Sequence, residues 1–312
     1  MTAVAVAGAG LTGASWAGLF AAAGLTVRLY DIDAQRLTPA LAQARSAADF
    51  LADHGLAAAA ALDQGLPGLS AAADPAEAFS SVALVQECVP EDLAMKREVF
   101  SLADRLAPPD ALIATSSSGL SISQIQTAAR RPQRCLAAHP YNPPHLVPLV
   151  ELAPGALTSV ETLERARAFY TAVGKQPIVL RRDVPGYVAN RLSAALWREA
   201  IELVRSGVAT VEDVDRAVAF GPGLRWAAMG PHLIYDLGGG PGGIDAHLRH
   251  LARVKEHMLR DLATWTEFPP DVAAALAEGL AREKAGRDYD ELVRERDELL
   301  AAYLKARRDL SS

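Results

Sequence analysis

The sequence is poor in cysteine and has no excess of basic residues. Its 312 residues include two cysteines, Cys88 and Cys135, which form no metal-ligand pattern and lie in apolar runs. We therefore expect reduced thiols, no metal centre and a cytoplasmic protein. The formal net charge of −6 and the pI near 5.7 argue against nucleic acid or a membrane surface as a partner.

The stretch from Met1 to Val27 lacks any charged side chain and is long enough to span a bilayer. It also lacks the basic start of a secretory signal. Five glycines interrupt it, at positions 8, 10, 13, 18 and 24. A glycine-rich strand, turn and helix therefore explain the stretch better than a membrane helix does.

Half of the residues are apolar and alanine is abundant, so we expect a globular protein with more helix than strand. Short buried strands alternate with helices until about residue 186, which is typical of a doubly wound parallel sheet. Beyond that point only helical patterns remain. The sequence predicts an α/β fold, with an N-terminal Rossmann-type doubly wound sheet in residues 1–186 and an all-α C-terminal domain in residues 187–312.

Periodicity and flanking glycines locate the individual elements. Five apolar runs predict strands over Ala3–Ala7, Thr26–Tyr30, Val82–Cys88, Leu112–Thr115 and Val179–Arg182. Helical patterns cover Ala14–Ala23, Ala34–Leu62, a segment from about Asp92 to Leu106, a long segment that ends near Gly207, and a charged amphipathic segment over residues 282–308.

The segment after the first predicted strand is Gly8-Ala9-Gly10-Leu11-Thr12-Gly13, and it opens a helix. Asp31 follows at the end of the second predicted strand. This context predicts a dinucleotide site, where Gly8 permits a tight turn, Gly10 admits the pyrophosphate and Gly13 allows close helix packing. The helix N-terminus offers free N–H groups to the phosphates. Because Asp31 would bind the ribose and repel a 2′-phosphate, we expect NAD.

A histidine and a glutamate, His139 and Glu151, flank a proline-rich segment. Four prolines, at 140, 143, 144 and 148, lie between them, so this segment cannot be a regular helix. We expect a rigid extended loop that runs into a strand over Leu146–Leu152. A carboxylate on the far nitrogen of an imidazole fixes its tautomer and raises its basicity. An arbitrary pair of this kind is more often two unrelated surface residues, but the dinucleotide motif favours a general base.

Six segments occur in an order that is specific to one group of enzymes. They are Gly8–Gly13, Gln86–Asp92, Ser116–Ser118, His139–Pro144, Pro148–Glu151 and Pro185–Leu192. Together they resemble the 3-hydroxyacyl-CoA dehydrogenase superfamily over nearly the whole chain. Within it, the sequence is most similar to the branch of L-gulonate 3-dehydrogenase (lambda-crystallin) and L-carnitine dehydrogenase.

The resemblance implies a role for each matching residue. His139 is similar to the catalytic base and Glu151 to its partner, while Ser118 matches the serine that binds the reacting hydroxyl and Asn190 an asparagine that places the substrate. The implied cofactor contacts are Gly8, Gly10, Leu11, Thr12, Gly13, Asp31, Glu91, Lys96, Ser116 and Asn142. The resemblance also implies a homodimer formed through the helical domain.

Three of these assignments have simpler interpretations. Ser116 and Ser117 would be ordinary serines at the rim of the sheet. Asn190 would cap the helix that it begins. Lys96 would be a solvated charge on its helix, which is the usual position of a lysine.

The residues also define a reaction. Oxidation of a secondary alcohol removes a hydride, which the nicotinamide accepts, and a proton, which His139 would take while Glu151 offsets the imidazolium charge. Ser118 and Asn190 can donate hydrogen bonds to the oxygen. This chemistry needs no metal.

Two features bear on the substrate. The segment Gly221–Pro231 departs from the acyl-CoA enzymes of the superfamily by its Arg225-Trp226 pair, and Arg225 would bind a free carboxylate or pair with a structural acid. The stretch Ala34–Asp74 lacks lysine, although the acyl-CoA enzymes carry a lysine-rich region here for the phosphates of CoA. Its only basic residues are Arg36, Arg45 and His54.

We therefore expect an NAD-dependent dehydrogenase that oxidises the 3-hydroxyl of a small free hydroxy acid, with L-gulonate as the first hypothesis. L-Carnitine is the nearest alternative, and aromatic rings around its quaternary ammonium would recognise it. A 3-hydroxyacyl-CoA is a third possibility, and a catalytically idle, crystallin-like NAD-binding protein belongs to another class. The complete catalytic set argues against inactivity. The candidate aromatics are Trp197, Trp226, Tyr235 and Trp265.

Overall fold

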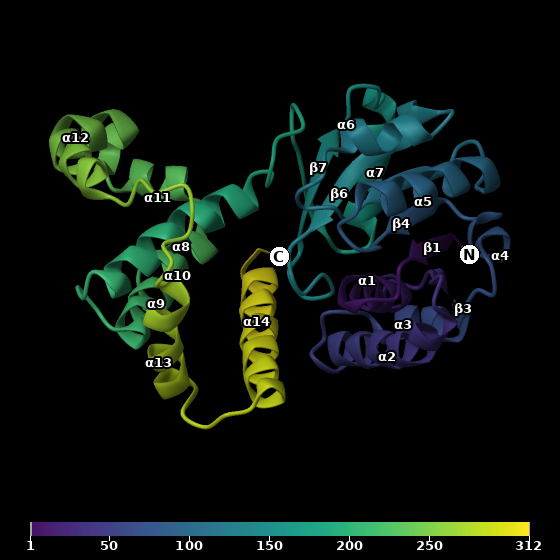
Figure 1. Cartoon of the computed structure of the whole chain (residues 1–312), viewed down its shortest axis with the longest axis horizontal. Coiled ribbons are helices and arrows are strands. Elements are labelled where there is room, and N and C mark those ends of the chain that lie inside the picture. Colours follow the sequence, from purple (N-terminus) through teal and green to yellow (C-terminus); the bar gives the residue numbers. More distant parts are fainter. Residues whose placement is uncertain (1, 312) are drawn as a thin grey trace. The chain divides into compact units, whose positions relative to one another are not determined.

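The computed structural model describes residues 2–311, and the chain divides into two compact units that we describe separately (Figure 1). The α/β unit contains the residues up to Asn190 together with those from Asp297 onward. The helical unit runs from Arg191 to Arg296. The predicted boundary at residue 186 lies close to this division, whereas the segment from Asp297 onward, which we assigned to the helical domain, groups with the α/β unit.

The α/β unit is built on one eight-stranded sheet with the strand order β3-β2-β1-β4-β5-β6-β7-β8. The strands β1 to β6 are parallel, β7 runs antiparallel to β6, and β8 is parallel to β7. Because β1 lies between β2 and β4, the strand order reverses at β1, and ligands of such sheets bind at this point. The strands are β1 (Ala3–Ala7), β2 (Thr26–Tyr30), β3 (Leu69–Ala71), β4 (Leu84–Glu87), β5 (Leu112–Thr115), β6 (Cys135–Pro140), β7 (Leu149–Pro154) and β8 (Gln176–Val179).

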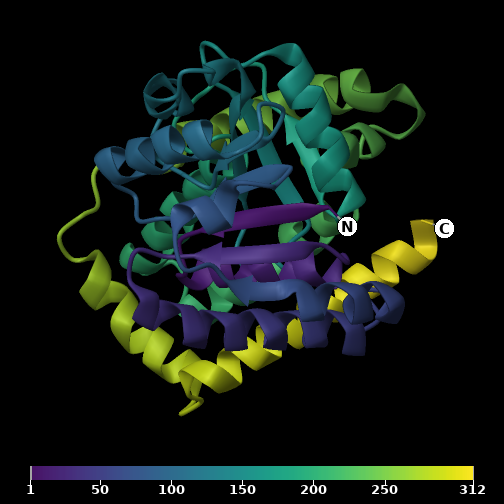
Figure 2. The same cartoon turned by 90° about the vertical axis from the view of Figure 1, so that its right-hand side faces the viewer.

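Helices cover both faces of this sheet, as the layers drawn in purple and blue in Figure 2 show. One hydrophobic core forms where α1, α2 and α7 pack on one face, and a second forms under α4, α5 and α6 on the other. The helices of the unit are α1 (Leu11–Ala22), α2 (Leu37–Asp53), α3 (Ala59–Gly65), α4 (Pro75–Phe79), α5 (Leu93–Leu106), α6 (Ile122–Ile125), α7 (Val160–Ala172) and most of α14 (Tyr289–Ser311). The predicted doubly wound α/β architecture is thus confirmed.

Two of the predicted helices are interrupted. The segment Ala34–Leu62 is not one helix, because α2 ends at Asp53 and Gly55 has a left-handed backbone, with φ +66°, that breaks the helical path before α3. The charged segment 282–308 is likewise divided between α13 and α14. Ala285 and Gly286, with φ +52° and +81°, separate these two helices.

The prediction that His139 lies in an extended loop was wrong, since it belongs to strand β6. The following strand, β7, begins at Leu149 and not at Leu146. Three of the four prolines fall in the connection 141–148, and the fourth, Pro140, ends β6, where a missing backbone N–H costs little. The prolines therefore shape the turn between two strands and do not prevent the strands from forming.

The helical unit contains no strand among its residues, 191–296, as predicted for the C-terminal domain. Its helices are α8 (Ala189–Arg205), which begins in the α/β unit, α9 (Val211–Phe220), α10 (Pro222–Ala228), α11 (Pro231–Leu237), α12 (Gly243–Asp261) and α13 (Val272–Lys284). Across residues 2–311, no helix is both long enough and apolar enough to cross a membrane.

Candidate active site

The glycine-rich turn after β1 has the geometry that its sequence predicts. Gly8 has φ +108°, and a Cβ atom there would lie 2.6 Å from the backbone carbonyl of Cys88. A Cβ at Gly13 would lie 1.9 Å from the carbonyl oxygen of Gly8. Both positions therefore exclude any side chain, the first because of the turn itself and the second because α1 approaches the turn so closely.

The N-terminus of α1 is open toward a ligand. Gly10 caps the helix without a side-chain hydrogen bond, and no atom lies within 4 Å of the position that its Cβ would occupy. Leu11 is 68% exposed and Thr12 is half-buried. The N–H groups of this first turn can thus bind the pyrophosphate of a dinucleotide.

Asp31 stands at the carboxyl end of β2, beside the turn. Its Oδ2 accepts a hydrogen bond from the N–H of Ala9 at 2.7 Å, and its Oδ1 accepts one from the N–H of Asp33 at 2.9 Å. An adjacent cavity of about 200 Å³ has apolar walls that suit an adenine ring, and these include Ile32, Val89, Pro90, Met95 and Val99. The glycine turn, Asp31 and this cavity together fit NAD.

Glu91 holds the serine loop that follows β5. Its Oε1 accepts hydrogen bonds from Ser117 Oγ at 2.6 Å, from the N–H of Gly119 at 2.7 Å and from the N–H of Leu120 at 3.1 Å. Partial burial would raise the pKa of Glu91, but these bonds and the nearby charge of Lys96 outweigh it and lower the pKa. The carboxylate is therefore ionised, and it fixes the loop that carries Ser118.

Lys96 is not a solvated helix charge, because it is 1% exposed. Its ammonium donates to Glu87 Oε1 at 2.8 Å and to the carbonyl of Val89 at 3.0 Å, and it lies 3.4 Å from Glu91 Oε2. Ser116 is also bound within the fold, since its Oγ accepts a hydrogen bond from Gln86 Nε2 at 2.8 Å. The geometry gives both residues a structural role, and a contact of either with the cofactor stays a prediction.

His139 and Glu151 are direct cross-strand neighbours in the antiparallel pair of β6 and β7. His139 Nδ1 lies 2.9 Å from Glu151 Oε2, and the two residues are 6% and 0% exposed. The other carboxylate oxygen, Oε1, accepts hydrogen bonds from the N–H groups of Val188 at 2.8 Å and Ala189 at 3.0 Å. The predicted pair is thus formed, and the carboxylate also binds the start of α8.

The electrostatics of Glu151 follow from these contacts. Burial favours the neutral acid and would raise its pKa, but hydrogen bonds from His139, Ala189 and Val188 together lower the pKa below its usual value. An ionised carboxylate only accepts, so His139 Nδ1 carries the proton and donates. The lone pair of Nε2, which has no hydrogen-bond partner within residues 2–311, can then accept a substrate proton.

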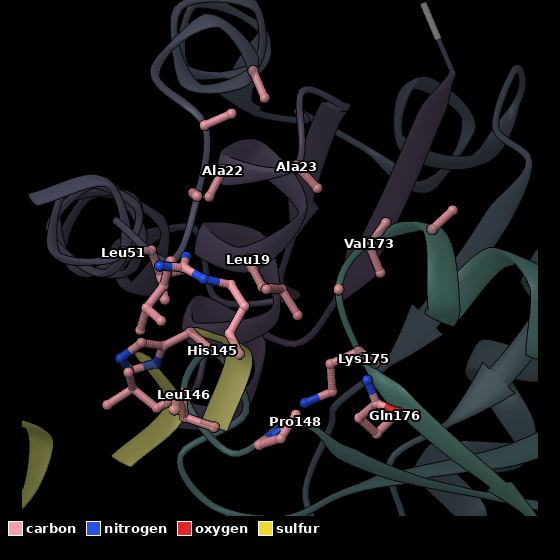
Figure 3. Close-up of a pocket in the computed structure, with 18 of the residues that line it drawn as sticks. Leu19, Ala22, Ala23, Leu51, His145, Leu146, Pro148, Val173, Lys175 and Gln176 are labelled. Atoms are coloured by element: carbon pink, nitrogen blue, oxygen red, sulfur yellow. The ribbon is translucent and has the colours of Figure 1, made fainter. Parts of the chain in front are cut away.

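The loop that links the two strands is anchored to the α/β unit by buried polar contacts (Figure 3). Lys175 is 2% exposed, and its ammonium donates to the carbonyls of Pro144 at 2.8 Å and Val147 at 2.5 Å. Burial lowers the pKa of Lys175 to about 7. His145 joins the loop to α1, since its backbone N–H donates to Ser15 Oγ at 2.9 Å. These anchors leave Asn142 exposed at the loop's start, where the nicotinamide contact is predicted.

Ser118 and Asn190, the two residues expected to place the substrate, are accessible. Ser118 is exposed and Asn190 is half-buried, and neither side chain forms a hydrogen bond with another of the residues 2–311. The interpretation of Asn190 as a helix cap was wrong, because Glu151 caps α8 through Val188 and Ala189. Both polar groups therefore remain available to a ligand.

Tyr187 belongs to this site, and our sequence analysis missed it. It is 2% exposed, and its ring centroid lies 5.2 Å from that of His139. Its φ of +49° is rare for a residue with a side chain, and it follows Gly186, with φ +74°. This left-handed turn directs the next two N–H groups onto Glu151. The Pro185-Gly186 pair signals such a turn, but it does not identify the residue that carries the strain.

In the helical unit, the residues considered for the substrate are spread out. Arg225, on α10, is exposed and forms no ion pair with any of the described residues, so its interpretation as a partner of a structural acid was wrong. Trp197 and Trp265 both pack against Phe268, at centroid distances of 5.6 and 5.7 Å. Tyr235 instead lies under the ammonium of Lys255. The four candidate aromatics therefore do not form one cage.

The part of the chain that the structure describes contains no cluster of three or more histidine, cysteine, aspartate or glutamate residues arranged to hold a metal. What the site offers is an imidazole with an ionised partner, two free polar side chains and a dinucleotide turn at the same edge of the sheet. Bound NAD would accept a hydride there. This set of groups is the one that reversible oxidation of a secondary alcohol requires.

Comparison with known proteins matches both parts of the chain to one family. The NAD-binding domain of 3-hydroxyacyl-CoA dehydrogenase matches residues 3–184, and the C-terminal domain of that family matches residues 186–289.

Individual relatives cover almost the whole chain. An L-carnitine dehydrogenase of Streptomyces coelicolor is 38% identical, over 97% of this chain and 94% of its own length. A 3-hydroxyacyl-CoA dehydrogenase of Gibberella moniliformis is 37% identical, over 99% of this chain and 96% of its own. Among solved structures, an NAD-dependent 5-formyl-3-hydroxy-2-methylpyridine 4-carboxylic acid 5-dehydrogenase is 30% identical, with a TM-score of 0.84 and coverage of 100% of this chain and 99% of that one.

Proposed function

Because the chain belongs to the 3-hydroxyacyl-CoA dehydrogenase family, we propose that it oxidises the 3-hydroxyl of a small free acid. Membership of this family identifies the chain as an NAD-dependent oxidoreductase that acts on CH–OH groups. The finer assignment, a free acid with L-carnitine as its best candidate, rests on the charges of the chain and on the relatives.

The observation that carries the reaction is the buried pair of His139 and Glu151. His139 Nε2 would take the proton of the hydroxyl oxygen, and bound NAD would supply the acceptor for the hydride of the carbon that bears this oxygen. Glu151 stabilises the imidazolium that results, since its carboxylate lies 2.9 Å from Nδ1. Ser118 and Asn190 donate to the oxygen and orient the carbon. In reverse, the imidazolium is the acid that reduces a ketone.

The α/β unit offers little to the phosphates of CoA between Ala34 and Asp74. Arg36 is 3.5 Å from Asp33, and Arg45 donates to the carbonyl of Leu69 at 3.1 Å. His54 lies 2.9 Å from Glu298. Each basic side chain of this stretch thus has a partner in the fold, and phosphates need such groups, or helix N-termini, to replace lost water. This favours a substrate without a nucleotide.

Arg225 suits the carboxylate of a free acid. Its guanidinium is exposed and has no acidic partner among residues 2–311, so it can bind a planar carboxylate with two parallel hydrogen bonds. We therefore assign to Arg225 the recognition of one small carboxylate.

Among free acids, L-carnitine is better supported than L-gulonate, our first hypothesis. The 38% identical relative from Streptomyces coelicolor carries the name L-carnitine dehydrogenase, and none of the relatives reported above is named for L-gulonate. L-Carnitine combines a carboxylate, a 3-hydroxyl and a quaternary ammonium. The exposed arginine and the acidic character of the chain are consistent with that combination.

Initial rates of NADH formation with L-carnitine, L-gulonate, 3-hydroxybutyrate and 3-hydroxybutyryl-CoA test this proposal. We expect the highest kcat/KM with L-carnitine, and the Arg225→Met variant should raise KM for the acid about tenfold or more while NAD binding changes little. Arg253→Gln, which removes an exposed charge from α12, is the control. A free acid other than L-carnitine at the top of the panel would retain the substrate class and change the substrate.

We also propose that the enzyme is a homodimer formed through its helical unit. Large apolar side chains are exposed along α12, namely Ile244 (40%), Leu248 (52%), Leu251 (39%) and Met258 (52%). Their helical spacing places them on one face of α12. A contiguous exposed apolar face of this kind needs cover in water, and a second copy of the chain, as the family resemblance implies, provides it.

A further inference from the structure

A cavity of about 130 Å³ lies directly beside Ser118 in the α/β unit. Its walls come from the serine loop after β5 and from the turn before α8. Since a cavity of about 150 Å³ can hold benzene, this one accommodates a compact group of four or five heavy atoms. The lining residues that matter here are Ser118, Leu120, Asp183, Val184, Pro185 and Tyr187.

One wall of this cavity carries a negative charge without a cationic partner. Asp183 Oδ2 accepts a hydrogen bond from Ser121 Oγ at 2.5 Å, and Oδ1 has no partner among residues 2–311. Arg181 and Arg182 precede Asp183, but both are exposed and neither forms an ion pair with it. A half-buried carboxylate with one free oxygen attracts a cation into the cavity.

A second wall is aromatic and carries an unsatisfied polar group. The hydroxyl of Tyr187 is buried and has no hydrogen-bond partner among the described residues. Burial, followed by the charges of Asp183, Glu91 and Glu151, raises the pKa of Tyr187 well above its usual value, so the phenol is neutral. An aromatic ring beside a carboxylate is a known combination for binding small cations.

Three further side chains of the lining are apolar. Leu120, Val184 and Pro185 offer no side-chain hydrogen bond to a ligand. Against these three side chains a methylated ammonium has no N–H group to satisfy, while a primary ammonium would depend on the polar groups of the other walls alone. These apolar side chains therefore suit the methyl groups of a quaternary cation.

Building on the proposed function, we propose that this cavity is a subsite for a small quaternary ammonium on the carbon next to the reacting carbinol. Ser118, the residue expected to bind the hydroxyl, forms part of its wall. In L-carnitine the trimethylammonium group has four heavy atoms and stands on that neighbouring carbon. Asp183 is the charge that recognises it, and a polyol acid such as L-gulonate would leave this carboxylate unpaired.

Comparison of L-carnitine with its neutral carbon isostere, 3-hydroxy-5,5-dimethylhexanoate, tests the subsite. The Asp183→Asn variant should lower kcat/KM for L-carnitine about tenfold or more and leave the isostere unchanged or improved, because only the ion–ion attraction is lost. Asparagine keeps the shape of the side chain and can still bond to Ser121. The matched control is Asp49→Asn, which replaces an exposed aspartate of α2 outside the cavity. It should leave kcat/KM unchanged for both substrates.

If Asp183→Asn lowered kcat/KM equally for L-carnitine and for the isostere, the proposal would be overturned, because Asp183 would then be a structural residue. Saturation-transfer NMR with tetramethylammonium chloride gives a readout that does not depend on turnover. We expect saturation to pass from the wild-type protein to the cation, and we expect no such transfer with the Asp183→Asn variant. If L-carnitine is not oxidised but this transfer is observed, the proposed substrate fails and the subsite stands. Absence of transfer in the wild type would refute the subsite whichever acid is oxidised.

Discussion

The two units of this chain differ in how completely they bury their apolar side chains. The α/β unit encloses two cores, one on each face of its sheet, and its catalytic pair is buried. In the helical unit the fully buried apolar residues are Ile201, Val211 and Val214, while long side chains on α12 stay exposed. The chemistry is therefore held by a self-contained scaffold. The helical unit leaves an apolar face of α12 exposed, which is why we propose that a second copy of the chain covers it.

The largest expected effect comes from removing the acid–base group of the α/β unit. Replacing His139 by Gln should lower kcat about 1,000-fold, because no other group of the site can take the alcohol proton. NAD affinity should stay within a few-fold, since the dinucleotide turn is untouched. Rapid-quench turnover and fluorescence titration with NADH measure the two quantities. Retained turnover would remove His139 from the mechanism.

A charge on the apolar face of α12 tests whether the helical unit forms the dimer interface. We expect Leu248→Glu to weaken dimer association about 100-fold, because it would bury an unpaired carboxylate in the interface. Sedimentation equilibrium measures the change. Arg253→Gln alters the net charge by the same amount on the same helix and should leave association unchanged. A wild-type monomer at micromolar concentration would contradict the proposed assembly.

Glu151 connects the catalytic histidine to the start of α8, so its replacement shows which of these two contacts catalysis needs. Glu151→Gln should slow turnover about 30-fold and move the pH dependence of kcat/KM, because the imidazolium loses its charge partner. A lower rate with an unmoved pH profile would mean that Glu151 acts only through its bonds to Val188 and Ala189.

The same residue makes a prediction about stability. Its folded pKa is lowered, so its contribution to the free energy of unfolding is present at neutral pH and is lost as the pH falls through that depressed pKa. The stability difference between wild type and Glu151→Gln should therefore shrink in acid. Urea unfolding at a series of pH values between neutral and acid measures it, and a difference that grows as the pH falls would contradict the assigned direction.

The smallest expected effect concerns the cofactor. Asp31→Ala should weaken NAD about tenfold, because it removes an acceptor for the ribose and also the bond to the N–H of Ala9. The ratio of NADP to NAD dissociation constants should also fall, since the carboxylate that repels the 2′-phosphate of NADP is lost. Dissociation constants of both cofactors, measured by titration, decide this. A wild type that prefers NADP would refute the assignment.

The features that the sequence predicted well are those with a local cause. The turn after β1 allows only glycine at two positions, and the strands β1, β2 and β5 were located to the residue because they are uniformly apolar or end at a polar residue. The pairing of His139 with Glu151 was also predicted, although the strand that carries His139 was not. The four prolines between these two residues concealed the antiparallel register that places their side chains opposite each other.

Features that depend on distant contacts could not be predicted. Lys96 was given a solvated position as its simpler interpretation. Its partners Glu87, Val89 and Glu91 lie only five to nine residues earlier, but the burial that brings them together depends on how α5 packs on the sheet. Asp183 lies outside the six matching segments, and Tyr187, although it lies within Pro185–Leu192, was given no role there. Their importance follows from a left-handed backbone and from a cavity, and a sequence pattern records neither.

A competition between two substrates shows whether the enzyme acts on a free acid or on a CoA thioester. Equimolar L-carnitine and 3-hydroxybutyryl-CoA are incubated with the enzyme and limiting NAD, and proton NMR follows the consumption of each, which gives the ratio of their kcat/KM values. Since the basic side chains between Ala34 and Asp74 are already paired and Arg225 is not, we predict that L-carnitine is consumed first. Preferential consumption of 3-hydroxybutyryl-CoA would contradict the account and assign the chain to the acyl-CoA substrates of its family.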